Sequence, residues 1–273
     1  MLTLIDWKSS AFISPEMLMQ LGAYYGATHY RENDGELLGW QERTPATTAQ
    51  QGAIIKIGPD YVGLAKREIW GEIQLADGTT KRGKVGEELM RLSQADLEAG
   101  FAQFRNALDI FWWLVKKQHV QLPKKEAYQF HDKQLVSVTY VLQHVIAKPM
   151  LLNWYAKMAK EGKDPEQERD RRGAEGSLWH KNILFFLQGR PVDLSQAPES
   201  LKQTLTQFAY WQQKVKLDPV ALETKVAHPA LGYAGTYDCL ARCTLGEAPA
   251  APEALGGVLK GVGSTTTPEG VHG

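Results

Sequence analysis

The sequence predicts an α/β protein with a central mixed β-sheet flanked by helices, in one domain over residues 1–245. Short runs with strand character occur at both ends of the chain, and long stretches with apolar residues at helical spacing lie between them. A chain of 273 residues is also long enough to bury one sizeable core.

The first half of the chain alternates predicted strands and helices. Pro15 suits the first turn of a helix, and Ser93 with Asp96 three residues later suits a helix N-terminus. The predicted elements are a central strand over 2–8, a helix over 15–25, a loop over 31–51, strands over 53–58 and 67–75, a polar connection, and a helix over 94–117.

The second half predicts three further helices and a hairpin. The elements are a weak strand over 128–136, a helix from 137 to about 160 interrupted at Lys148-Pro149, helices over 177–187 and 198–215, and strands over 223–226 and 232–243. Basic and acidic residues alternate over 157–172, which favours a solvated loop and leaves phosphate contact by its arginines open. His228 and Tyr233, beside the hairpin turn, are expected to be surface turn residues, with DNA contact as the alternative. Residues 246–273 are mostly Gly, Ala, Pro, Thr and Ser and predict a disordered tail.

The composition indicates an intracellular enzyme that does not interact with membranes. No apolar run approaches the ~20 residues that a membrane helix needs, and no secretory signal is recognised. Two cysteines, Cys239 and Cys243, lie too far apart on one strand to bridge and cannot supply the four ligands of an iron–sulfur cluster. The net charge is +0, and no phosphate-binding GxxxxGK[ST] run occurs, so ATP hydrolysis is not expected.

Acidic residues and a lysine that suit metal-dependent hydrolysis lie near opposite ends of the chain. Asp6-Trp7-Lys8 ends the first strand, and Glu223 and Asp238 lie on the last two strands. Carboxylates are ligands that Mg²⁺ and Mn²⁺ prefer, and the Trp7 carbonyl would add another oxygen. Lys8, two residues after Asp6, points to the same face of its strand and would orient or deprotonate a water molecule.

Six motifs in the sequence resemble those of the PD-(D/E)xK nuclease superfamily, in its RecB-like exonuclease branch. The similarity is greatest to the group that includes the mitochondrial genome maintenance exonuclease and its phage relatives. The motifs are Ser137-Val138-Thr139, Gly176-Ser177-Leu178-Trp179-His180, Glu223, Gly235-Thr236-Tyr237-Asp238, Asp6-Trp7-Lys8 and Gln20-Leu21-Gly22-Ala23-Tyr24. This order is a circular permutation of that of the family, with the join near residues 118–125.

The resemblance implies a circularly permuted restriction-endonuclease-like sheet and a role for each motif residue. It implies catalytic Asp6, Lys8, Asp238, Glu223 and His180. It implies a Mg²⁺ or Mn²⁺ site formed by Asp238, Asp6, Trp7 and His180. Finally, it implies substrate contacts by Gln20 and Tyr24.

The expected function is that of a Mg²⁺-dependent DNA exonuclease, acting on single-stranded or flap DNA in replication, recombination or repair. The alternatives are a structure-specific endonuclease with the same site, and a DNA-binding module without catalysis. The expected partners are single-stranded DNA and a helicase or single-strand-binding protein. Because permutation separates the two catalytic strands, a strand-swapped homodimer is a further alternative. The expected location is the cytoplasm of a bacterial or phage-infected cell.

Overall fold

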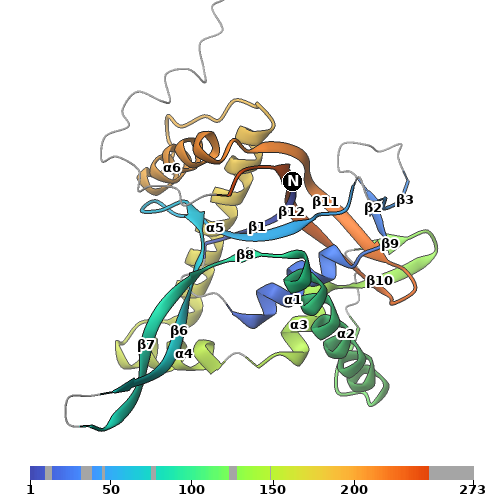
Figure 1. Ribbon diagram of the computed structural model, residues 1–273, viewed down its shortest axis with the longest axis horizontal. Coiled ribbons are helices and arrows are strands. Elements are labelled where there is room, and N and C mark those ends of the chain that lie inside the picture. Colours follow the sequence, from blue (N-terminus) through green and yellow to red (C-terminus); the bar gives the residue numbers. More distant parts are fainter. Residues whose placement is uncertain are drawn as a thin grey trace, which may run out of the picture.

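A mixed β-sheet with helices on both faces forms the protein (Figure 1). The computed structural model describes residues 1–9, 14–31, 39–44, 47–74, 78–122, 128–147 and 149–245. The predicted α/β class and mixed central sheet are therefore confirmed. The predicted tail over 246–273 and the last part of the predicted join, residues 123–125, lie outside the described residues. None of the helices within these ranges is both long and apolar enough to span a bilayer.

Ten strands of the described residues make up the central sheet. Its main path is β3 (Gln41–Glu42), β2 (His29–Arg31), β11 (Asp218–His228), β12 (Tyr233–Arg242), β1 (Leu2–Lys8), β4 (Gln51–Lys56) and β5 (Gly63–Leu64). Beside this path, β8 (Arg91–Leu92) pairs with β4, and β10 (Lys133–Ser137) pairs with β12 and with β9 (Tyr128–Phe130). The β1–β4 and β10–β12 pairs are parallel and the others antiparallel, which makes the sheet mixed.

One edge of β12 is shared by two neighbours. The start of β12 pairs with β10 through Tyr233 and Ala234, whereas its end pairs with β1, for example Ile5 with Cys239. Residues 235–238 lie in the interval between these pairings, and Asp238 is therefore located where β1 and β10 diverge. The predicted antiparallel pairing of the first strand with the Asp238 strand forms within one chain.

Two layers of helices cover the sheet (Figure 1). Helices α1 (Pro15–Tyr25), α2 (Gln94–Lys116) and α3 (Val138–Val145) share one hydrophobic core with Leu4 of β1. Helices α5 (Pro165–Leu187) and α6 (Glu199–Val215) share a second core with Ile5 and Trp7. Because successive strand side chains point to opposite faces, Asp6 and Lys8 follow Leu4 toward α1. Helix α4 (Pro149–Lys160) contacts α5.

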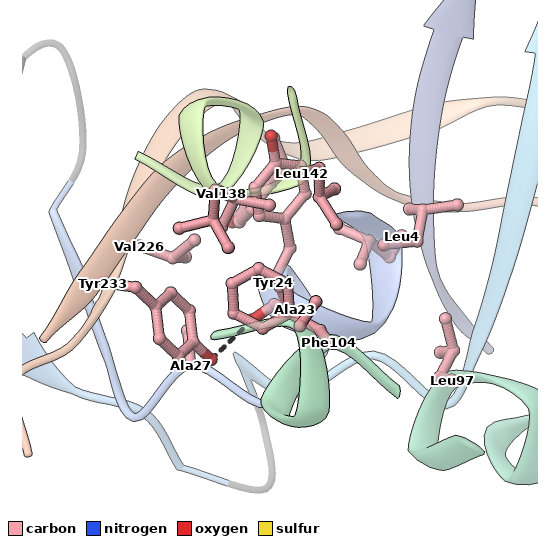
Figure 2. Close-up of a cluster of buried hydrophobic side chains, with 14 of the residues drawn as sticks. Leu4, Ala23, Tyr24, Ala27, Leu97, Phe104, Val138, Leu142, Val226 and Tyr233 are labelled. Atoms are coloured by element: carbon pink, nitrogen blue, oxygen red, sulfur yellow. Dashed lines mark hydrogen bonds between the residues drawn. The ribbon is translucent and has the colours of Figure 1, made fainter. Parts of the chain in front are cut away.

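The core beneath α1 fixes the start of β12 to the end of that helix. Figure 2 shows the Tyr233 hydroxyl donating to the Ala23 carbonyl, at 2.9 Å. The Tyr233 ring also packs edge-on against Phe104, with centroids 4.8 Å apart. The expectation that Tyr233 lies at the surface is wrong, since its side chain is fully buried.

The predicted loop over 157–172 is wrong, because helix α5 begins at Pro165. The Asp164 side chain caps it by accepting from the Glu166 and Gln167 amides. Glu168 then pairs with Arg171 and Arg172 at helical spacing, which stabilises an exposed polar helix that no apolar pattern could reveal.

Strands are also missing from the prediction. The polar connection after residue 75 contains β7 (Thr80–Leu89), which pairs with β6 (Lys66–Gln74) in a separate two-stranded sheet that projects from the body (Figure 1). Charged residues and glycines conceal β7 in the sequence, and backbone pairing to β6 overrides their low strand propensity. The predicted loop over 31–51 likewise contains the short strand β3.

Candidate active site

The predicted acidic pair lies at the end of β1 and on β12. The Asp6 side chain is buried, with 2% of the residue exposed, and its Oδ2 atom is 2.7 Å from Lys8 Nζ. Asp238 accepts a hydrogen bond at Oδ2 from the Trp7 amide, at 2.6 Å. This bond continues the link between β1 and β12 where their regular pairing ends. The Trp7 indole lies in the core on the opposite face, edge-on to Phe208 and Trp211.

Electrostatics tie the two carboxyl groups and the lysine into one cluster. Burial and the nearby Asp6 charge raise the pKa of Asp238 well above 3.8, despite the opposing effect of the Trp7 amide. Burial is the largest single effect and would lower the pKa of Lys8, but the contact with Asp6 and the charges of Asp238 and Glu16 together raise it above 10.5. Lys8 is therefore an ammonium donor at neutral pH.

Glu223 faces this cluster from β11 through an unusual backbone conformation. Its φ is +45°, in the left-handed region that residues other than glycine rarely adopt. The flanking Leu222 and Thr224 pair with Cys239 and Tyr237, so Glu223 lies across from Asp238. Burial and the Asp6 charge raise the pKa of Glu223. Such local strain persists only where the surrounding structure imposes it, and it is common at functional sites.

His180 approaches the cluster from α5. Its pKa is lowered by burial, with Asp6 acting against this effect and Lys8 adding to it. The imidazole is therefore largely neutral at pH 7, the form that ligates metals. A Cβ on Gly176, one turn earlier, would lie 2.6 Å from Ser9 Oγ, just beyond the end of β1. The glycine of the Gly-Ser-x-x-His motif thus lets the helix approach the strand.

The predicted substrate-binding pair lies on the face of α1 that contacts Lys8. Gln20 accepts from Lys8 Nζ at 3.3 Å and donates from Nε2 to the Tyr24 hydroxyl at 2.8 Å. Tyr24 is buried, and burial with the Asp6 charge raises its pKa well above 10, so it stays protonated. A Cβ on Gly235 would clash with the Tyr24 ring, which explains why the Gly-x-x-Asp motif begins with glycine.

Three further residues belong to the surroundings of the site and were not predicted. The Tyr128 hydroxyl is 3.0 Å from Thr236 Oγ1, and the Glu223 charge, after burial, helps raise the Tyr128 pKa. Glu16 adds to the charges that raise the Lys8 pKa. Arg43 donates to the carbonyls of α1's last turn, including those of Tyr24 and Tyr25. Of these three residues, only Glu16 could have been found from the sequence. It lies four residues before Gln20 on a predicted helix, and this spacing places both residues on the same helix face.

The charges of the cluster favour a bound cation. Asp6, Glu223 and Asp238 supply three carboxyl groups, and Lys8 supplies one ammonium. Asp6 Oδ2 is buried, and the Lys8 ammonium lies 2.7 Å from it. Buried carboxylates that outnumber the nearby positive charges are stabilised by further cations. The residues therefore fit a divalent ion, although the described part of the chain contains no ready group of three or more metal-ligating side chains.

The fold and cluster define an α/β protein with a mixed sheet and a partly buried acidic site that carries one lysine. No protein-family model matches the chain, and no curated protein or solved structure matches it.

The raised Asp238 pKa predicts a pH-dependent stability. Above pH 3.8 the folded protein retains the Asp238 proton more strongly than the unfolded chain, so this group lowers the free energy of unfolding as pH rises through that window. Asp238→Asn removes the effect and keeps an acceptor for the Trp7 amide. We expect the metal-free variant to melt at least about 3 °C above wild type near pH 8, and to show a smaller gap near pH 4. Thermal melts in EDTA measure this, and equal gaps at both pH values would contradict it.

Proposed function

We propose that the protein is a metal-dependent DNA exonuclease that hydrolyses single-stranded or flap DNA. One observation carries the proposal: residues from both ends of the chain, Asp6 and Lys8 on β1 and Asp238 on β12, converge in one partly buried acidic cluster. Their spacing along the strands matches the motifs of PD-(D/E)xK nucleases, in a circularly permuted order. This similarity also supports a restriction-endonuclease-like sheet.

Asp6 and Asp238 would hold a Mg²⁺ or Mn²⁺ ion, with the neutral His180 and the Trp7 carbonyl as further ligands. The ion would polarise the phosphate and offset the charge of the transition state. Lys8, as an ammonium, would orient the attacking water and stabilise negative charge. Glu223, whose raised pKa makes it a better proton acceptor than an ordinary carboxylate, would take the proton of the water.

The α1 side chains would position the substrate. The Tyr24 hydroxyl stays protonated and accepts from Gln20, so its own hydrogen is available to a phosphate oxygen. Gln20 in turn holds the Lys8 ammonium. Single-stranded DNA is the proposed partner, with a helicase or single-strand-binding protein supplying it during replication, recombination or repair.

A DNA-binding module without catalysis is the second candidate. The observation in its favour is that the described residues contain no ready group of three metal-ligating side chains. A structure-specific endonuclease would use the same residues as the exonuclease and differs in its substrate alone.

Linear and circular single-stranded DNA separate these functions. With Mg²⁺ or Mn²⁺, we expect the wild-type protein to degrade the linear strand, to leave the circle intact and to be inactive in EDTA. Cutting of the circle would indicate an endonuclease. Binding of both strands without cleavage under either metal would reject the enzyme and favour the binding module.

A further inference from the structure

Lys8 links the acidic cluster to α1. Its Nζ atom lies 2.7 Å from Asp6 Oδ2 and donates to Gln20 Oε1 at 3.3 Å. An ammonium has three donor hydrogens, so a third remains for another acceptor. The Lys8 ammonium thus lies between the carboxylates of the strands and the polar face of α1.

Glu16 lies one helical turn before Gln20. Residues four apart share a helix face, so Glu16, Gln20 and Tyr24 form one polar stripe along α1. Glu16 is half-buried, and its charge acts on Lys8. It belongs to none of the six motifs, yet its negative charge acts on Lys8 from α1 and not from the strand pair.

We propose that Lys8 is a built-in counter-ion of the acidic site, which a divalent cation displaces from Asp6, and that Glu16 and Gln20 receive its ammonium. The inference rests on the proposed function, because it requires a cation at Asp6 and Asp238. It assigns to Glu16 the role of a positioning residue that acts through Lys8.

Charge decides the sign of the expected effects. While the Lys8 ammonium contacts Asp6 Oδ2, it neutralises the negative charge that would attract a divalent ion. Removing the ammonium should therefore strengthen binding of the divalent ion. Removing the Glu16 charge deprives the displaced Lys8 ammonium of one of its two acceptors. Binding of the divalent ion should therefore weaken. If Lys8 only maintained the shape of the site, its removal would weaken binding instead.

Calorimetric titration with Mn²⁺ alone, without DNA, tests the proposal in the full chain near pH 8. We expect Lys8→Met to bind Mn²⁺ at least about tenfold more tightly than wild type, and Glu16→Gln at least about threefold more weakly. Glu199→Gln is the matched control, because Glu199 also lies in the first turn of a helix, but on α6. Its affinity should equal that of wild type.

Two results would overturn the proposal. The first is unchanged or weaker Mn²⁺ binding by Lys8→Met in a variant with the circular dichroism spectrum of wild type. The second is an unchanged affinity of Glu16→Gln, which decides the matter if Lys8→Met does not fold. Wild-type protein that binds no Mn²⁺ would instead reject the proposed metal-dependent function itself.

Discussion

Lys8→Ala is expected to lower the rate of metal-dependent cleavage of linear single-stranded DNA by at least about 10³-fold. The substitution removes the only ammonium in contact with Asp6 among the described residues, and with it the donor that would orient the attacking water. Initial rates of nucleotide release in Mg²⁺, with substrate in excess, measure the effect.

Lys202→Ala is the control for this loss. Lys202 lies on α6, which covers the opposite face of the sheet, so its removal should leave the rate within about twofold of wild type. If Lys8→Ala retained the wild-type rate in Mg²⁺, the catalytic role of the lysine would be refuted, whatever the fate of the control.

Gly22→Ala is expected to lower the free energy of unfolding by about 3 kcal/mol or more. Helices α1 and α2 cross at Gly22 and Gly100, and a Cβ on Gly22 would collide with the backbone at Phe101 N and Gly100 C. Backbone cannot rotate aside as a side chain can, so the helices must separate and the face that carries Gln20 and Tyr24 must move. Urea denaturation followed by circular dichroism measures the change.

Gly173→Ala provides the matched comparison. Gly173 is also helical, but a Cβ there would meet nothing within 4 Å. Alanine is the better helix former, so this variant should gain about 0.5–1 kcal/mol. Equal stabilities of Gly22→Ala and Gly173→Ala would contradict the close helix crossing.

The sequence was most informative where local pattern and packing agree. The alternation of residues 2–8 predicted a central strand, and the Ser93 capping box with its helical apolar spacing predicted α2. Helix α2 buries the face that its pattern indicates, whereas β1 is buried on both faces. The clustering of Asp6, Asp238 and Lys8 also followed from motif spacing, because antiparallel pairing of two adjacent strands is enough to bring them together.

Features set by distant contacts could not be predicted. The left-handed conformation of Glu223 interrupts the pairing of β11 with β12 between Leu222 and Thr224, and no local sequence pattern indicates it. Tyr128 reaches Thr236 across 108 residues of sequence. Arg43 looks like a loop residue, yet it is half-buried and anchors the end of α1.

The location of a bound Mn²⁺ ion tests the central claim most directly. The account holds that the two ends of the chain build one cation site. In crystals grown with Mn²⁺, it predicts an anomalous difference peak within ligand distance of both the Asp6 and Asp238 carboxylates, with Lys8 Nζ no longer in contact with Asp6. A well-diffracting crystal grown with Mn²⁺ that shows no anomalous peak at these residues, or shows its peak elsewhere, would contradict the account.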